Sequence, residues 1–370
     1  MHPNALAPYT TFRLGGPAAR LLTARTDADL IAAVRDADSR GEPVLLLGGG
    51  SNLVISDDGF PGTAIRIATQ GVTLDGTSLE LAAGETWSDA VAATVRAGLA
   101  GIECLAGIPG SAGATPIQNV GAYGQEVSST ITEVVAYDRR AGETVTLSNA
   151  ECGFSYRGSR FKEDPSRFVV LRVRFSLDSA AGMSAPLKYA ETARALGVPV
   201  GERVPLEKAS ATVLALRAGK GMVLDAADHD TWSAGSFFTN PILTAAEFAA
   251  FLDRVHDRLG PDAAPPAFPT ADGVSTDGGS TESVSTDRVS TDRGGRTKTS
   301  AAWLIDKAGF TKGYGTGPAR ISGKHTLALT NRGTATTADL LALAREVRDG
   351  VHAAFGVTLV NEPVMVGVRL

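Results

Sequence analysis

The pattern of apolar and polar positions changes in character along the chain. In the first half, short apolar runs of strand length alternate with glycine-rich turns, beginning with residues 43–47, which end at three glycines. Similar runs occupy residues 64–67, 79–83, 133–137 and 169–177. In the last run, apolar residues alternate with Arg172 and Arg174, which predicts a strand with one apolar and one charged face.

Helical periodicity becomes frequent after about residue 185. Before that point, the clearest candidate is 88–99, with Ser88 as its N-cap. The later candidates are 206–217, 245–259, 301–308 and 337–355. Two of them have a marked start: Thr244 with Glu247 forms a capping box, and Thr336 with Asp339 opens the other helix. Apolar residues at helical spacing follow both, which predicts amphipathic helices packed on a core.

Length and composition indicate a globular protein of two or three domains. A chain of 370 residues exceeds one ordinary core, and 43% hydrophobic with 20% charged residues is typical of soluble proteins. One tract, 270–299, differs because it repeats Val-Ser-Thr-Asp from residues 274, 284 and 289 with almost no large apolar side chain. Such a tract cannot offset the roughly 1–2 kcal/mol per residue that backbone ordering costs, so we expect a disordered insertion.

Charge and cysteine content exclude several classes of partner. The net charge of −5 argues against a nucleic-acid or anionic-membrane surface. Cys104 and Cys152 form no CxxC pair, so neither a metal site nor a disulfide framework is indicated. The chain starts without a charged segment followed by an apolar run, and no stretch of about 18 apolar residues occurs. We therefore expect a cytoplasmic protein.

Two glycine-rich segments could contact a cofactor. Gly48, Gly49 and Gly50 end a predicted strand and precede Ser51 and Asn52, so amide groups and two polar side chains could converge on a pyrophosphate. An ordinary tight turn explains three glycines equally well. The spacing matches neither GxGxxG nor the P-loop, so a Rossmann or P-loop fold is unsupported.

The second segment is a long loop over residues 107–126. It holds five glycines and two prolines between Gly107 and Gly124 and shows no apolar periodicity. Its neutral hydrogen-bonding side chains suit the carbonyl and ring nitrogens of a flavin better than a metal: Ser111, Gln118, Asn119 and Tyr123. A linker loop that satisfies its own backbone is the alternative.

Taken together, these segments resemble the UDP-N-acetylenolpyruvoylglucosamine reductase family nearly end to end. The matching motifs, in order, are residues 10–17, 47–53, 107–124, 156–162, 234–241, 301–305 and 361–363. The resemblance implies an α+β protein with a vanillyl-alcohol-oxidase (PCMH)-type FAD-binding region of two small lobes at 1–185. A C-terminal α+β substrate-binding domain at 186–370 would carry the insertion at about 270–299.

The resemblance also implies roles for individual residues. Arg157, Ser236 and Glu362 correspond to the catalytic set, and Tyr189, Lys220 and Asn240 to substrate-binding positions near the UDP phosphates and sugar. The positions implied for binding FAD without a covalent link are Gly48, Gly49, Gly50, Ser51, Asn52, Gly110, Ser111, Gly113, Ala114, Gln118, Asn119, Gly121, Ala122 and Tyr123. Cys104 could attach a flavin, but we expect it to be a small buried hydrophobe.

The chemistry of the implied reaction explains the catalytic residue types. Hydride transfer from flavin to the enolpyruvyl group leaves negative charge on the substrate, which Arg157 would stabilise as a fixed cation. Ser236 would protonate the resulting enolate, and a protonated Glu362 could share the stabilisation. Arg157 would lower the pKa of Glu362 and burial would raise it, so both protonation states stay open.

The expected activity is therefore reduction of UDP-N-acetylglucosamine enolpyruvate to UDP-N-acetylmuramate by a monomeric FAD enzyme. NADPH would donate the hydride, and the product would serve peptidoglycan precursor synthesis. Two alternatives stand beside it: an oxidase of a small alcohol or sugar lacking UDP, and a non-catalytic nucleotide-sugar-binding protein. The 234–241 and 361–363 motifs weigh against the first, and the intact catalytic set against the second.

Overall fold

The structure is a computed structural model that describes residues 2–179, 181–270 and 295–370. The chain forms two compact units, and each is assembled from separated stretches. Unit 1 comprises Met1–Ala5, Pro17–Gly50 and Phe60–Ala218, whereas unit 2 comprises Leu6–Gly16, Ser51–Gly59 and Gly219–Leu370. The division after Ala218 differs from the boundary expected at 185/186, because the helices that follow residue 185 pack with unit 1.

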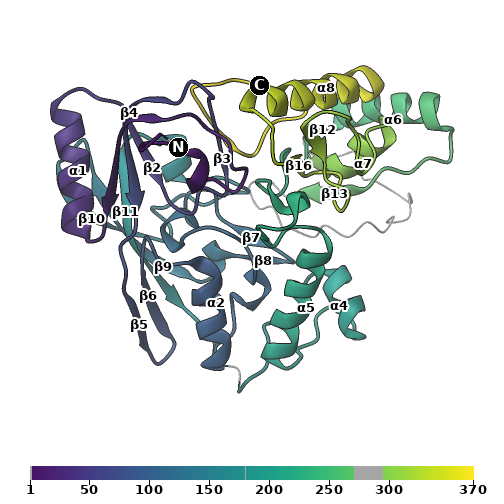
Figure 1. Cartoon of the computed structure of the whole chain (residues 1–370). Helices are drawn as coiled ribbons and strands as arrows, with labels where there is room; N and C mark the ends of the chain where they lie inside the picture. The colour runs from purple at the N-terminus through teal and green to yellow at the C-terminus, as the bar shows by residue number, and fades with distance from the viewer. Residues whose placement is uncertain (1, 180, 271–294) are drawn as a thin grey trace. The chain divides into compact units, whose positions relative to one another are not determined.

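A three-stranded parallel sheet begins unit 1. Its strands run in the order β1 (Ala18–Ala24), β4 (Phe60–Ile67) and β2 (Val44–Leu47). Helix α1 (Asp27–Ser39) follows β1, and Leu30 and Val34 pack it against buried residues of this sheet (Figure 1). The sequence patterning did not single out this helix, although Thr26 caps it by accepting from Asp29 N at 3.0 Å.

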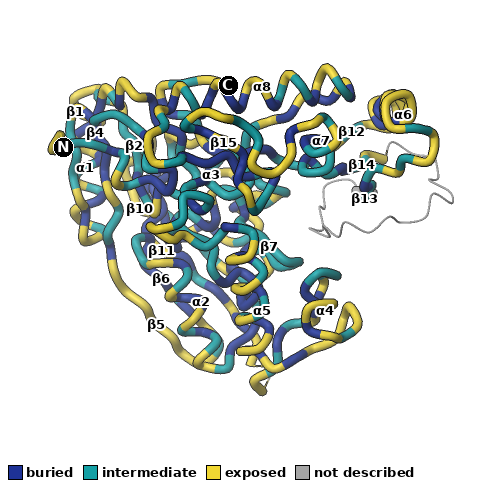
Figure 2. Tube along the Cα trace, turned by 45° about the vertical axis from the view of Figure 1, so that its right-hand side comes forward, coloured by how far each residue is buried: buried dark blue, intermediate teal, exposed yellow. Residues whose placement is uncertain are grey.

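A five-stranded antiparallel sheet forms the larger part of unit 1. Its order is β10 (Glu143–Ser148), β9 (Ile131–Asp138), β11 (Phe168–Ser176), β6 (Ser78–Ala82) and β5 (Val72–Asp75). The predicted alternation in β11 is confirmed in its second half, where Arg172 and Arg174 both bind Glu80. Residues 168–171 are all buried, so the expected single apolar face is wrong for the first half, where both faces of the strand meet a core. The edge strand β5 is exposed along its length (Figure 2).

Short elements complete unit 1. They are α2 (Trp87–Arg96), η2 (Glu103–Leu105), η3 (Ala112–Ala114), β7 (Gly121–Ala122), β8 (Gln125–Glu126), η4 (Val127–Ser129), α3 (Arg160–Glu163), α4 (Ala190–Leu196) and α5 (Leu206–Gly219). The predicted N-cap of α2 was wrong. Thr86 occupies that position, and Ser88 lies inside the helix with its hydroxyl donating to Ile108 O at 3.2 Å.

Unit 2 combines small sheets with two long helices. Its elements are η1 (Ala7–Tyr9), β3 (Leu53–Ile55), η5 (His229–Thr231), β12 (Ile242–Thr244), α6 (Ala245–Leu259), β13 (Ala267–Thr270), β14 (Arg296–Thr299), α7 (Ala301–Lys307), β15 (Ala319–Ile321), β16 (Leu329–Asn331), α8 (Thr337–Phe355) and β17 (Val364–Val366). Strands β12, β14 and β13 form one antiparallel sheet, β15 pairs antiparallel with β16, and β17 pairs parallel with β3.

The two helix starts predicted from sequence are confirmed, and each carries a capping box. Thr244 and Glu247 begin α6, and Thr336 and Asp339 begin α8. Each threonine hydroxyl accepts from the backbone N–H three residues ahead, and each carboxylate accepts from the threonine N–H. The apolar faces of α6, α7 and α8 meet in one core, so patterning alone located the main packing surface of unit 2.

The Ser/Thr/Asp-rich tract differs from expectation at its edges. Residues 295–299 were assigned to a disordered insertion, but β14 pairs with both β13 and β12 there. Thr299 is fully buried, and its hydroxyl donates to Pro266 O at 2.8 Å. The β-branched threonines of this segment suit a central strand, which explains the correction. The remainder of the predicted insertion, 271–294, lies outside the described residues.

Candidate functional site

Two glycine-rich turns lie directly against each other in unit 1. A Cβ atom on Gly48 would stand 2.5 Å from Ser111 Oγ, and one on Gly49 would stand 2.5 Å from Gly110 Cα. Real Cβ atoms essentially never approach other heavy atoms this closely, so only glycine permits the contact. The fold therefore joins the two segments that the sequence proposed for one cofactor.

The backbone of these turns can serve a ligand. Gly50 and Ser111 are buried, yet among the described residues neither amide N–H donates a hydrogen bond. Buried N–H groups nearly always have an acceptor, and neighbouring amides in glycine turns bind phosphate oxygens. The turns therefore fit a pyrophosphate such as that of FAD. Ser51 and Asn52, assigned to the same turn, begin a stretch of unit 2.

The close packing of the turns makes a direct test possible. A Gly49→Ala substitution adds a methyl group that Gly110 cannot accommodate. Overpacking of this kind costs about 1–3 kcal/mol, so we expect FAD to bind about ten- to a hundredfold more weakly. The flavin-to-protein absorbance ratio of the purified variant, titrated with FAD, measures this. Gly317→Ala is the control because a Cβ there meets nothing within 4 Å; equal FAD affinity in both variants would contradict the prediction.

Gly113 and Ala114 lie in η3, directly after the second turn. The N–H of Gly113 donates to Ala83 O at 2.9 Å, and a Cβ on Gly113 would stand 2.4 Å from Ala83 Cβ. This glycine therefore allows η3 to pack against the end of β6. It supports the shape of the loop, whichever ligand the loop binds.

Asn119 also holds the shape of the loop. The side chain is buried, and Nδ2 donates to Glu126 Oε2 at 3.0 Å and to Ser155 O at 3.1 Å. Oδ1 accepts from Ser128 N at 3.1 Å. Because these bonds engage both ends of the amide, the side chain stabilises its own loop, which is the alternative that sequence left open. Gln118 and Ala122, its neighbours in the assignment, are half-buried.

Arg157 lies against the same loop. Its Nη2 donates to Gly121 O at 2.9 Å, and its guanidinium carbon lies 5.2 Å from the ring centre of Tyr156. The backbone of Arg157 has φ +53°, in the left-handed region, where Lys162 Nζ donates to its carbonyl at 2.7 Å. Such strain in a non-glycine residue is concentrated at functional sites. Unit 1 therefore brings the predicted catalytic cation to the predicted flavin loop.

Two tyrosines with different predicted roles are in contact. The rings of Tyr123 and Tyr189 meet edge to face with 5.3 Å between their centres, although sequence assigned one to cofactor and the other to substrate. Burial raises the pKa of Tyr123 to about 12, an effect that the charge of Arg217 opposes. Arg217 is only 7% exposed, and desolvation lowers its pKa to about 10. Sequence reasoning missed this arginine because a cation on a helix usually faces solvent.

Unit 2 gathers three other motifs. Ser236 precedes Phe237, whose carbonyl accepts from Glu362 N at 2.9 Å. The carbonyl of Glu362 accepts from Asn52 Nδ2 at 3.4 Å, and Val364 N donates to Asn52 O at 2.9 Å. The backbones that carry Ser236, Glu362 and Asn52 are therefore neighbours. Ser236 itself is half-buried.

The remaining substrate candidates lie on separate segments of unit 2. Asn240 Oδ1 accepts from Ala301 N at 3.0 Å, so its oxygen satisfies an amide in the first turn of α7. Its amide nitrogen is the part that could serve a ligand. Lys220 directly follows the last residue of α5 and is half-buried.

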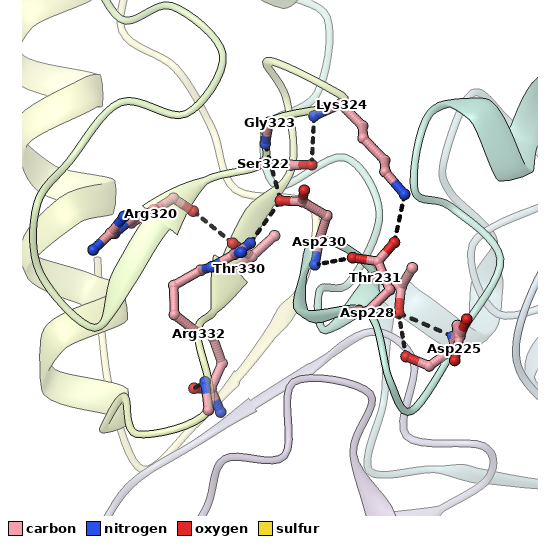
Figure 3. Close-up of polar contacts among 12 residues, drawn as sticks. Asp225, Asp228, Asp230, Thr231, Arg320, Ser322, Gly323, Lys324, Thr330 and Arg332 are labelled. Atoms are coloured by element: carbon pink, nitrogen blue, oxygen red, sulfur yellow. Dashed lines mark hydrogen bonds and ion pairs between the residues drawn. The ribbon is translucent and has the colours of Figure 1, made fainter.

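A polar cluster joins the segment between Lys220 and Ser236 to the hairpin of β15 and β16 (Figure 3). Its members in the segment are Asp225, Asp228, Asp230 and Thr231, and those at the hairpin are Gly323, Lys324 and Arg332. Lys324 Nζ pairs with Asp228 Oδ2, and this ion pair lowers the pKa of Asp228 and raises that of Lys324. Asp230 Oδ1 accepts from Gly323 N at 2.9 Å and Arg332 Nη1 at 2.6 Å.

Other candidate groups do not form sites. Cys104 and Cys152 are buried; burial raises the pKa of Cys104 far above its usual range and that of Cys152 to about 11. His229 and His325 are half-buried, and the ring of His229 meets that of Trp232 edge to face. Within the described ranges, we find no metal-binding group of three His, Cys, Asp or Glu side chains. Nor does that part of the chain contain a helix long and apolar enough to cross a bilayer.

Comparison with known proteins places both parts of the chain. Residues 18–148 match the FAD binding domain family, and residues 226–366 match the family described as UDP-N-acetylenolpyruvoylglucosamine reductase, C-terminal domain. Together they confirm the predicted α+β fold with a PCMH-type FAD-binding domain.

Whole-chain relatives agree with these matches. A UDP-N-acetylenolpyruvoylglucosamine reductase from Streptomyces coelicolor is 73% identical over 100% of this chain and 91% of its own length. A reductase of the same name from Thermobifida fusca is 56% identical over 99% of this chain and 97% of its own length. The crystal structure of the reductase from Thermus caldophilus superposes with a TM-score of 0.63 at 26% identity, covering 98% of this chain and 97% of that one. The chain therefore belongs to the UDP-N-acetylenolpyruvoylglucosamine reductase family.

Proposed function

We propose that this protein reduces UDP-N-acetylglucosamine enolpyruvate to UDP-N-acetylmuramate, with FAD as cofactor and NADPH as hydride donor. The product would serve peptidoglycan precursor synthesis, and the enzyme would act as a cytoplasmic monomer. Family membership supports the flavoenzyme and the UDP-sugar substrate. The observation that carries the proposal is the bond from Arg157 to Gly121, which fixes a permanent cation on the glycine-rich loop of the FAD-binding unit.

The two glycine turns would hold the cofactor. Their contact leaves the buried amides of Gly50 and Ser111 for the pyrophosphate, while Asn119 and Gly113 keep the loop in one shape. Held there, FAD would contribute the redox chemistry that passes hydride from NADPH to the substrate. The protein contributes position, charge and a proton.

Arg157 would stabilise the charge that develops on the substrate. Reduction of the enolpyruvyl double bond places negative charge on the carbon next to the carboxylate and on the carboxylate itself. A guanidinium whose Nη2 donates to Gly121 O and whose carbon lies 5.2 Å from the Tyr156 ring centre is held before the reaction begins. Such preorganised charge lowers a barrier more than a mobile cation does, because no reorganisation is needed.

Ser236 and Glu362 would complete the reaction from unit 2. The hydroxyl of Ser236 would donate the proton to the enolate, which is basic enough to accept it from an alcohol. Glu362 would share the stabilisation of the enolate. The bond from Glu362 N to Phe237 O supports this assignment, because it ties the two motifs together through their backbones.

Tyr189, Lys220 and Asn240 would bind the UDP sugar. Lys220 supplies a counter-charge for the phosphates, and Asn240 still has its amide nitrogen to donate. The contact of Tyr189 with Tyr123 supports a place for Tyr189 next to the flavin loop. In this arrangement, Tyr123 would form the border between cofactor and substrate.

Two measurements test the proposal. The purified protein should show a flavin spectrum, and a colourless protein that takes up no FAD would reject any flavoenzyme function. NADPH consumption should depend on UDP-N-acetylglucosamine enolpyruvate and yield UDP-N-acetylmuramate. Equal NADPH consumption with and without that substrate would favour an oxidase of another substrate. A protein that binds the UDP sugar but never turns it over would instead be a binding protein.

A further inference from the structure

We infer that Asp230, through its ion pair with Arg332, is a positioning residue for Lys220. The inference rests on the proposed function, in which Lys220 binds the phosphates of the substrate. It starts from the segment 220–236, which carries Lys220 at one end and Ser236 at the other. Its one regular element is the short η5, so the shape of the segment depends on specific contacts.

The segment first closes on itself. Asp225 N donates to Thr231 Oγ1 at 2.9 Å, and the single proton of that hydroxyl is shared between Asp225 O and Asp228 O, at 2.8 and 2.7 Å from the oxygen. Thr231 is 6% exposed, so these bonds form out of water. Asp228 Oδ1 accepts from Asp230 N at 2.9 Å and caps η5. Residues 225–231 therefore behave as one compact turn.

Asp230 then attaches this turn to the hairpin of β15 and β16. Its Oδ1 accepts from Gly323, which follows β15, and from Arg332, which follows β16 (Figure 3). The side chains of Asp230 and Arg332 are 17% and 32% exposed, so solvent only partly screens the pair. The second pair, Lys324 with Asp228, joins the same two segments at a more exposed position.

The backbone of Asp230 contacts Gly221, the residue next to Lys220, so the position of Asp230 affects that of Lys220. Gly221 is buried with φ +68°, and a Cβ on it would stand 3.0 Å from Asp230 O. Its backbone therefore rests on the backbone of Asp230, one residue from Lys220. A change in the position of Asp230 moves the surface that supports Gly221.

Ser236 has anchors of its own at the other end of the segment. Phe237 N donates to Leu327 O at 2.8 Å, and Thr11 Oγ1 donates to Ser233 O at 2.6 Å. Neither bond involves Asp230. Loss of the Asp230–Arg332 pair should therefore affect substrate binding through Lys220 and leave the proton donor in place.

Asp230→Asn tests this division, because it keeps the shape and the acceptor oxygen but removes the charge. We expect KM for UDP-N-acetylglucosamine enolpyruvate to rise about tenfold while kcat changes by about twofold or less. Arg332→Gln, which breaks the pair from the more exposed side, should raise KM as much as Asp230→Asn does. Arg332→Lys should keep KM near that of the unaltered enzyme, since one N–H suffices for the bond that Arg332 Nη1 makes.

The decisive variant combines Asp230→Asn with Lys220→Ala. If Asp230 acts through Lys220, the Asp230 change should raise KM no further once Lys220 is absent. Asp138→Asn is the matched control, because Asp138 also binds an arginine, Arg167 at 2.7 Å, but at the end of strand β9 in unit 1. That variant should keep the KM of the unaltered enzyme.

The outcomes separate this inference from the proposed function. An unaltered enzyme that does not turn over the UDP sugar overturns both. If the unaltered enzyme is active, three results each overturn the inference alone. They are an unchanged KM in Asp230→Asn, a loss of kcat without a change in KM, and an equal rise in KM with and without Lys220.

Discussion

Ser236→Ala should leave reduction of the flavin by NADPH intact and slow its reoxidation by substrate about 10²–10⁴-fold. In the proposed mechanism, Ser236 donates its proton only when the substrate has accepted hydride, so only the second half-reaction would lose its acid. The backbone that fixes the position, from Phe237 N to Leu327 O, does not use the serine side chain. Stopped-flow measurement of flavin absorbance separates the two half-reactions.

Ser236→Cys is the matched variant for that experiment. A thiol occupies nearly the same place and can still donate a proton, so part of the lost reoxidation rate should return. Both variants should bind FAD and unfold at nearly the temperature of the unaltered protein. Reoxidation at the normal rate in Ser236→Ala would remove Ser236 from the acid role and direct attention to Glu362.

Arg157→Lys should slow reoxidation about 10²–10³-fold, even though the positive charge is conserved. Lysine cannot both donate to Gly121 O and present a planar pair of N–H groups to a carboxylate. It also loses the delocalised guanidinium whose carbon lies 5.2 Å from the centre of the Tyr156 ring. Flavin reduction by NADPH and the affinity for FAD should stay close to normal, and the same stopped-flow measurement tests this.

Arg160→Lys is the control for that change. Arg160 lies on the same short segment but is exposed, so its replacement should leave both half-reactions unaltered. A variant Arg157→Lys with a normal reoxidation rate would show that charge alone suffices. The preorganised geometry described here would then have no catalytic consequence.

Periodic segments of the sequence predicted the fold well where burial is one-sided. Strand β11 alternates over residues 171–175, where charged side chains occupy one face, and α6 and α8 carry apolar stripes behind capping boxes. Helix α1 was not recognised from the pattern, although Thr26 precedes it as a side-chain cap. The polar tract was misjudged at 295–299, where strand pairing with distant residues outweighs local composition.

The candidate site was predictable as motifs but not as contacts. Glycine turns indicated a phosphate-binding backbone, and the close approach of Gly49 to Gly110 agrees with that role. Sequence could not show that Asn119 is occupied by Glu126 and Ser155, or that Arg217 is buried. Nor could it pair Asp230 with Arg332, because nothing local to either residue identifies a partner about a hundred positions away.

The interleaved path of the chain constrains the order in which the protein can be made. Strand β3, formed by residues 53–55, pairs in parallel with β17, formed by residues 364–366. During synthesis, β3 must therefore wait without its partner until nearly all of the chain has been translated. Unit 1 has no such requirement beyond Ala218 and can mature first. A cut after Ala218 would leave β17 in the second fragment and its partner β3 in the first. The two units therefore cannot be produced as separate proteins by one cut.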